Sequence, residues 1–329
     1  MHQKVIYLDQ NIWICLAQAY YGRNRNPDDA KVCKAVLKAS ESDKVIFPLS
    51  AVHMVETHRN NQQQRRERLI DFMIEVSKMY TIPNYEYLIY AELYRAIIKR
   101  LDPEVFQEMI KRLDPRYFQQ IINYFYPAVN IKDFIIRKGI SNMLANNEIK
   151  GLDNKEAFIR VCKNEEASNV VRANRYLDYI RADNIEKWRN QVICWNEDRN
   201  RRSDAFFSKA FVDEIVGKIV RIKHLELDFP KEVLSPKELC SNQNDIINFS
   251  KDVPTFDVFS ELFRRRLNDY NKPLETNDFY DIASLAVAIP YCDIVVAEKK
   301  FSAIAKDAKL DKIYNTIILS SIKELGQNI

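Results

Sequence analysis

Six acidic side chains lie at the ends of apolar segments near the two ends of the 329-residue chain. A lone carboxylate among apolar residues is costly to bury, and several carboxylates together at neutral pH need a cation. Hard ions such as Mg²⁺ and Mn²⁺ prefer oxygen ligands, and they neutralise the charge that develops when water attacks a phosphodiester. The six candidate metal ligands are Asp9, Glu56, Asp278, Asp281, Asp293 and Glu298.

Two apolar segments near the amino terminus position the first acids. Residues 4–14 predict a short strand that delivers Asp9 and Asn11 at its carboxyl end, where open α/β sheets place their ligand crevices. Residues 45–50 predict a second strand, and Glu56 follows on a helix. The structural alternatives are a cap or turn role for Asp9 and a solvated helix position for Glu56.

The carboxyl-terminal part of the chain supplies the other four acids. Asp278 and Asp281 share one face of a predicted helix, so both can reach one ion, although either would also favour the helix dipole without a metal. Residues 293–298 predict a strand with an acid at each end. The alternatives here are a strand start for Asp293 and pairing of Glu298 with the lysines that follow it.

Together these segments resemble the PIN-domain nucleases. The resemblance covers roughly the first 60 and the last 55 residues, and it departs from the family pattern at Glu298, where the family usually has Asp. It rests on Tyr7-Leu8-Asp9-Gln10-Asn11, on Glu56, on Asp281-Ile282-Ala283 and on Val296-Ala297-Glu298-Lys299-Lys300-Phe301.

The resemblance implies a PIN-like α/β core with a short parallel central sheet built from both chain ends. It implies a metal-dependent endonuclease that uses Mg²⁺ or Mn²⁺, most often on RNA, and leaves a 5′ phosphate and a 3′ hydroxyl. Isolated nucleases of this kind are often toxins or antiviral effectors, so such a role is an expectation at the level of the family. The implied catalytic ligands are Asp9, Glu56, Asp281 and Glu298, with Asp278 and Asp293 as further ligands and Asn11 orienting a ligand or a water.

The middle of the chain is predicted to be a large helical insertion. Apolar residues recur at helical spacing between positions 60 and 100, and a twelve-residue unit that starts at Lys99 is repeated at once from Lys111. We therefore expect residues 1–60 and 251–329 to form the core and residues 61–250 to form the insertion. The insertion is expected to shape substrate access or to bind a protein partner or inhibitor.

Three arginine clusters offer positive charge for phosphate groups, at residues 65–68, 199–202 and 264–266. Aromatic residues follow the second cluster, and unpaired bases can stack on such rings. The opposing interpretation is a helix with an aromatic core stripe and solvated arginines. Contact with nucleic acid, RNA in preference to DNA, is predicted at Arg199, Arg201 and Arg202.

Composition argues against several other classes. A net charge of +4 is only mildly basic, and five glycines leave no Walker loop or dinucleotide fingerprint. The six cysteines never approach C-x-x-C spacing, so neither a zinc ribbon nor a thioredoxin-like motif is supported. Several of them stand among apolar residues, which favours reduced, buried thiols in a cytoplasmic protein. His53 and His58 do not have the spacing of a zinc-binding helix, so a zinc site there is the weaker alternative. The absence of a long apolar stretch and of a signal-peptide pattern disfavours membrane insertion and secretion.

Two function classes remain open at this point. One is the metal-dependent nuclease. The other is a catalytically inactive PIN-like module that binds RNA or a protein, for which Glu298 in place of the usual Asp would be the sign. Cleavage that requires Mg²⁺ or Mn²⁺ and stops with EDTA would separate the two classes.

Overall fold

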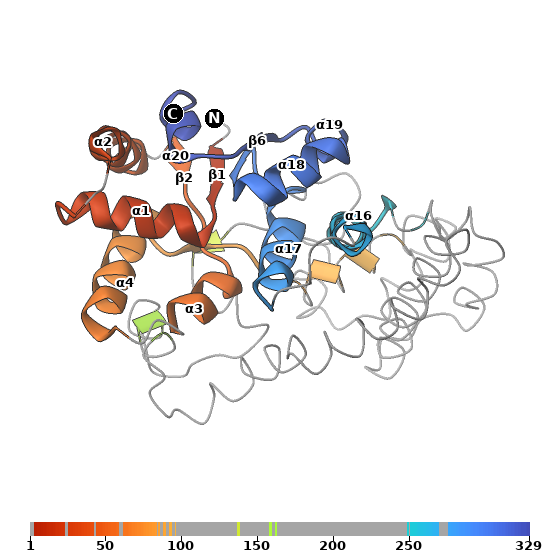
Figure 1. Ribbon diagram of the computed structural model, residues 1–329, viewed down its shortest axis with the longest axis horizontal. Coiled ribbons are helices and arrows are strands. Elements are labelled where there is room, and N and C mark those ends of the chain that lie inside the picture. Colours follow the sequence, from red (N-terminus) through yellow and green to blue (C-terminus); the bar gives the residue numbers. More distant parts are fainter. Residues whose placement is uncertain are drawn as a thin grey trace, which may run out of the picture.

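A computed structural model describes most of the two ends of the chain and a few residues between them (Figure 1). The predicted nucleic-acid residues Arg199, Arg201 and Arg202 lie outside the described residues, and so do the twelve-residue repeat and nearly all of the predicted insertion. The described residues are 3–23, 26–42, 44–58, 62–83, 85, 88, 89, 92, 93, 96, 137, 138, 158, 159, 162, 249, 251–269 and 276–329.

A four-stranded parallel sheet with the order β2-β1-β5-β6 lies at the centre of the described part. Strand β1 pairs with β2 on one side and with β5 on the other, so strands from opposite ends of the chain are neighbours. The predicted α/β class with a short parallel sheet built from both chain ends is therefore confirmed. The strands are β1 (Lys4–Leu8), β2 (Val45–Ile46), β5 (Ile294–Val296) and β6 (Ile317–Leu319).

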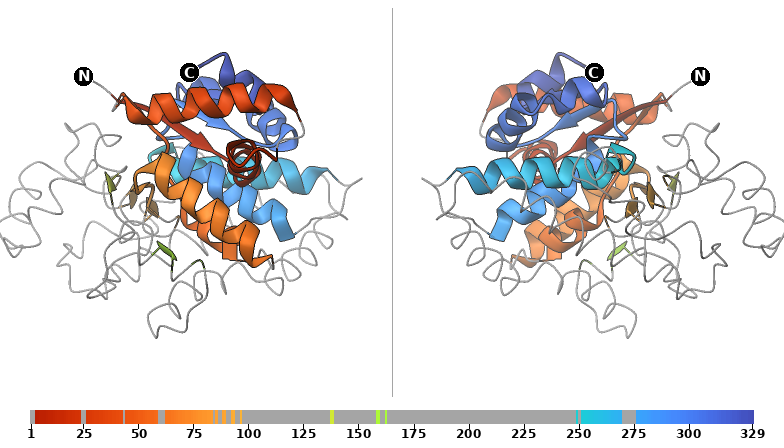
Figure 2. Two further views of the ribbon diagram at one scale, coloured as in Figure 1. Left: turned by 90° about the vertical axis from the view of Figure 1, so that its left-hand side faces the viewer. Right: turned by 90° about the vertical axis from the view of Figure 1, so that its right-hand side faces the viewer.

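Helices cover both faces of this sheet (Figure 2), as an apolar parallel sheet requires. Their bounds are α1 (Gln10–Tyr20), α2 (Pro27–Glu41), α3 (Ala51–His58), α4 (Gln63–Ser77), α16 (Pro254–Asn268), α17 (Thr276–Ala288), α18 (Lys299–Asp307), α19 (Leu310–Ile313) and α20 (Ile322–Gly326). An antiparallel pair, β3 (Tyr80–Thr81) with β4 (Arg137–Lys138), forms a second sheet, and Leu49, which follows β2, forms a parallel bridge with Thr81.

Alternate residues of β1 belong to two different hydrophobic cores, because successive side chains of a strand point to opposite faces. Ile6 and Leu8 pack with residues of α1, α2 and α4. Val5 and Tyr7 pack with residues of α16, α17 and α18. The strand that ends next to Asp9 is therefore fixed from both sides, which gives the edge of the sheet a rigid base.

The first strand is shorter than its apolar pattern predicts. Residues 4–14 were expected to form one strand, but the strand ends at Leu8 and α1 begins at Gln10. Asp9 has extended dihedral angles and caps the helix, because its carboxylate accepts a hydrogen bond of 2.9 Å from the Gln10 amide. Asn11 accordingly lies in the first turn of α1. The apolar residues after Asp9 bury one face of that helix, namely Ile12, Trp13, Leu16 and Ala17.

A buried carboxylate joins three segments on the α16 side of the sheet. Glu92 is 1% exposed and accepts a hydrogen bond of 2.9 Å from the Thr255 amide in the first turn of α16. The Thr255 and Tyr291 hydroxyls also donate to Glu92. This network attaches α16 to the turn that leads into β5. Among the helices that the structure describes, none is both long and apolar enough to cross a bilayer.

Candidate functional site

The parallel pairing of β1 and β5 brings Asp9 and Glu298 to the same edge of the sheet. Leu8 lies opposite Val296, and the Asp9 amide donates a hydrogen bond of 2.9 Å to the Val296 carbonyl. Glu298 follows two residues after Val296, and its Oε1 accepts a hydrogen bond from the side-chain amide of Asn11. Asn11 therefore orients a candidate metal ligand.

Helix α3 extends from β2 past the carboxyl end of β1 and contacts α17 (Figure 1). A buried hydrogen bond of 3.0 Å from Gln10 Nε2 to Thr57 Oγ1 ties the start of α1 to the end of α3. Gln10 directly follows Asp9, and Thr57 directly follows Glu56. This contact consequently holds together the two elements that carry the first two acids.

Asp281 of α17 is the most strongly perturbed carboxyl group at this edge. Burial raises its pKa, and the negative charges of Asp9, Glu56, Glu298 and Asp278 raise it further, to about 9. These acids come from the β1–α1 junction, α3, the β5–α18 junction and α17. Segments that are far apart in the sequence therefore act on one partly buried carboxyl group.

Asp9 is affected in the same direction but less strongly. The side chain is 7% exposed, and burial raises its pKa to about 6. Hydrogen bonds from the backbone of Gln10 and Glu298 lower the pKa, whereas the Glu298 charge raises it. Ionising Asp9 and Asp281 together is thus unfavourable unless a cation offsets the repulsion.

Asp278 lies on the same helix, but protein cations balance its charge. Arg266 of α16 contacts Asp278 Oδ2 through Nε at 2.8 Å and through Nη2 at 2.7 Å, and Lys300 of α18 donates to Oδ1. Arg266 and Asp278 are 1% and 3% exposed. With both oxygens engaged, Asp278 joins α16, α17 and α18, and we leave it out of the proposed ligand set.

Asp293 lies at the opposite edge of the sheet from Asp9 and Glu298. It precedes β5, and its Oδ2 accepts a hydrogen bond of 2.8 Å from the Val5 amide. The two ends of a parallel strand lie at opposite edges, so the structure does not bring Asp293 together with the other predicted ligands. Its carboxylate aligns the starts of β1 and β5, and it too is left out of the ligand set.

His53 is a core residue of α3. The side chain is fully buried, its ring stacks on Tyr7 with 5.1 Å between centroids, and its Nδ1 accepts a hydrogen bond of 3.0 Å from the Ser50 amide. Burial lowers the pKa of His53 to about 3, so the imidazole is neutral at physiological pH. These contacts give the imidazole ring a structural role in the core.

The arginine cluster at residues 264–266 is used for ion pairs within the protein. Arg264 and Arg265 both contact Glu261, at 2.8 Å and 2.6 Å, and Arg266 is paired with Asp278. The sequence already contained part of this signal, because Glu261 precedes the first two arginines by three and four residues. The pairing of Arg266 could not be anticipated, since its partner lies on another helix.

The donor chemistry at the carboxyl edge fits a hard divalent ion. Asp9, Asp281 and Glu298 are carboxylates that form no ion pair with any described residue. Their side chains do not yet meet around one point: within the described ranges, no three His, Cys, Asp or Glu side chains lie close enough to hold a metal.

The site is therefore defined by the contacts of this chain alone. Acids from both ends of the sequence lie close enough at the carboxyl edge of the sheet for their charges to raise the pKa of Asp281, while Asp278 and Asp293 have structural partners. Comparison with protein-family models, with curated proteins and with solved structures gave no match for the chain.

Proposed function

We propose that this protein is a metal-dependent phosphodiester hydrolase, an endoribonuclease whose site consists of Asp9, Glu56, Asp281 and Glu298. The supporting observation is the raised pKa of Asp281, which burial and the charges of acids from several distant segments produce. Repulsion of this kind destabilises a protein unless a bound cation offsets it. Carboxylates are the ligands that Mg²⁺ and Mn²⁺ prefer.

The residues of the chain have distinct tasks in this proposal. A bound divalent ion supplies positive charge to the phosphoryl oxygens and to the leaving 3′ oxygen. The Asp9 amide donates a hydrogen bond to the Val296 carbonyl, and the Asp9 carboxylate accepts one from the Gln10 amide at the start of α1. The side-chain amide of Asn11 donates a hydrogen bond to Glu298. The Asp281 carboxyl group holds a proton at neutral pH in the metal-free protein and must release it to become a ligand.

The PIN-like description of the core belongs to the same proposal. It is supported by the position of Asp9 after the first strand, by Glu56 in the helix that follows the second strand, and by Glu298 after the neighbouring β5. RNA as the substrate, a toxin or antiviral role, and a helical insertion at residues 61–250 that binds a partner rest on the sequence and the resemblance alone.

One observation favours the second candidate, an inactive PIN-like binding module. No three of the possible ligand side chains in the described part of the chain approach closely enough for one metal ion. If the acids remain apart when Mn²⁺ is added, the protein would retain RNA or a partner without cleaving it. This alternative and the hydrolase differ in one direct measurement.

The test is cleavage of a labelled single-stranded RNA by the purified protein with Mg²⁺, with Mn²⁺ and with EDTA. Asp281→Asn removes a proposed ligand, and Asp307→Asn removes an exposed acid at the end of α18 as the matched control. The hydrolase proposal expects metal-dependent cleavage by the wild type and the control, and none by Asp281→Asn. Equal cleavage by all three would mean a contaminating nuclease. RNA retention without cleavage would select the binding module.

A further inference from the structure

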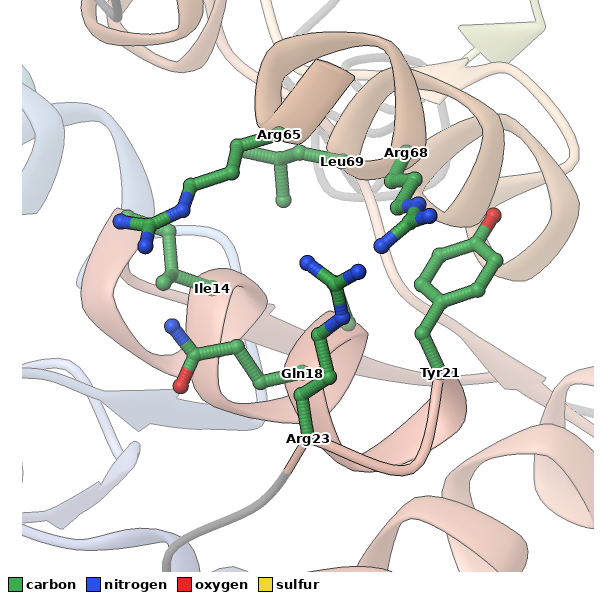
Figure 3. A pocket seen from close by; sticks show the side chains of 8 residues that line it. Ile14, Gln18, Tyr21, Arg23, Arg65, Arg68 and Leu69 are labelled. Carbon is green, nitrogen blue, oxygen red and sulfur yellow. The ribbon is translucent and has the colours of Figure 1, made fainter. Parts of the chain in front are cut away.

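Three arginine side chains line a pocket between α1 and α4 (Figure 3). Arg23 comes from the segment after α1, and Arg65 and Arg68 come from α4. The guanidinium groups of Arg23 and Arg68 are directed toward one another across the pocket, whose volume is about 390 Å³. This volume is within the range of small-molecule sites, which begins at roughly 300 Å³.

The described lining of the pocket carries an excess of positive charge. None of its lining residues is acidic, and no described residue forms an ion pair with Arg23, Arg65 or Arg68. The cluster at residues 264–266 is different, because each of its arginines has a carboxylate partner. Converging guanidinium groups without a carboxylate favour an anionic ligand, and their forked donors suit phosphate oxygens.

The remaining lining suits a nucleoside attached to that phosphate. The apolar side chains of Ile14 and Leu69 and the Tyr21 ring form walls, and Gln18 contributes an amide. Arg68 lies over the Tyr21 ring, 5.4 Å from its centroid, so this part of the pocket presents both charge and an aromatic surface. Bases of single-stranded nucleic acids stack on such surfaces, while the backbone contacts the basic groups.

The pocket also lies in line with the acids at the carboxyl edge. Asn11, Ile14 and Gln18 recur at intervals of three and four residues, so they share one face of α1, and Tyr21 follows as the cap at the end of the helix. Asn11 contacts Glu298, and Gln18 lies about 10 Å further along the helix axis. A single strand of a few nucleotides that follows this face of α1 would therefore reach from the pocket to the acids.

We propose that this pocket binds a phosphate group and its nucleoside within a single-stranded nucleic acid whose strand continues along α1 toward the acids. The direction of the strand toward the acids rests on the proposed function. Binding in the pocket itself needs neither a metal ion nor cleavage. The arginine run at residues 65–68 was one of the two clusters for which the sequence favoured nucleic-acid contact less than for residues 199–202, and Arg23 was not a candidate because it stands outside any run.

The test is the affinity for a short fluorescent single-stranded RNA, measured by anisotropy in EDTA over a series of salt concentrations. The variant R23A/R65A/R68A removes the pocket charges. The control K306A/K312A/K323A removes three positive charges from exposed positions on α18, α19 and α20. We expect the pocket variant to bind at least about 10-fold more weakly, with a salt slope lower by about 2, and the control to change far less.

A second variant keeps the test decisive if the alanine protein is poorly folded. R23K/R65K/R68K retains the charge but loses the forked donors, so its affinity should lie between those of the wild type and the alanine variant. Unchanged affinity and salt slope in both pocket variants would overturn the proposal. Equal weakening by the pocket variant and the control would overturn it too, because it would indicate a diffuse charge effect.

Two further arms identify the source of the phosphate and separate this inference from the hydrolase proposal. If a free 5′-mononucleotide binds the wild type as tightly as the RNA does, the pocket is a site for free nucleotides and the strand proposal is wrong. RNA binding that depends on the arginines in a protein without cleavage supports the pocket and rejects the hydrolase. Metal-dependent cleavage together with unaltered RNA binding by the pocket variant supports the hydrolase and rejects the pocket.

Discussion

Asp278 and Asp281 lie three residues apart on α17, yet the charges that surround the two carboxyl groups are of opposite sign. Arg266 and Lys300 reach Asp278 from two other helices and balance its buried charge. Asp281 instead faces the carboxylates of other segments, and its pKa is raised to about 9. The comparison separates an acid that stabilises the fold from one that destabilises it unless a ligand is present.

The largest expected effect on activity is that of Asp281→Asn. If a metal ion at this edge supplies several kcal/mol of transition-state stabilisation, loss of a ligand should reduce RNA cleavage by about 1,000-fold. The melting temperature in EDTA should stay unchanged or rise, because one repelling carboxyl group is gone. A large drop in melting temperature would instead show that Asp281 is a structural residue like Asp278.

The largest expected effect on stability is that of Asp278→Ala. It leaves the guanidinium group of Arg266 buried without its partner, and breaking a buried ion pair in this way costs about 3–5 kcal/mol. Urea unfolding of Asp278→Ala and of Asp281→Asn measures the difference in stability between the two variants directly. Equal stability of the two variants would contradict the distinction between the two acids.

Mn²⁺ should stabilise the wild type, because a ligand that binds only the folded state shifts the unfolding equilibrium. At a concentration about 100 times the Kd, the gain in unfolding free energy is about 2.7 kcal/mol. The same titration should give little gain for Asp281→Asn and a full gain for Asp307→Asn. A full gain for Asp281→Asn would place the metal elsewhere on the protein.

The stability of the metal-free protein should fall as the pH rises. Asp9 and Asp281 have folded-state pKa values of about 6 and about 9, above the ordinary value for Asp, so the folded state binds more protons than the unfolded state in this range. Each such proton lowers the unfolding free energy by up to about 1.4 kcal/mol per pH unit. Their contribution is complete below about pH 4 and is lost as the pH rises through 6 and 9.

Thermal unfolding in EDTA across this pH range provides the measurement. Asp281→Asn should remove the dependence between pH 6 and 9 but keep the part that Asp9 causes. Asp307→Asn serves as the control, since its side chain is exposed at the end of α18. A slope above pH 6 that survives in Asp281→Asn would assign the titration to another group.

The smallest expected effect is that of Thr57→Val, which removes the hydrogen bond between α3 and Gln10 while keeping the side-chain shape. Loss of one such bond costs about 1 kcal/mol of stability. Because this bond ties Glu56 and Asp9 together, Mn²⁺ affinity should fall more than it does in Ser302→Ala, which removes a hydroxyl that bonds only within α18. Equal metal affinity of the two variants would show that Thr57 has no part in positioning the acids.

The sequence predicted much of the sheet and most of the acids at its carboxyl edge. Apolar runs at residues 4–8, 45–46 and 294–296 are strands, and the acids that follow them meet at one edge because the strands are parallel. The boundary at Asp9 was misplaced, since apolar residues after it fit a strand or a helix until the cap is known. Strand β6 was missed because three residues are too short to show a period.

The sequence by itself determined which residue types stand at the ends of apolar segments, and hence that acids of both chain ends lie at one edge of a parallel sheet. Only the tertiary structure decided that Asp278 has cationic partners, that Asp293 lies at the far edge, and that three arginines line one pocket beside α1. The physical reason is that local patterns follow from neighbours in the chain. The charge state and role of an acid or an arginine depend instead on groups that other helices and strands bring within a few ångströms.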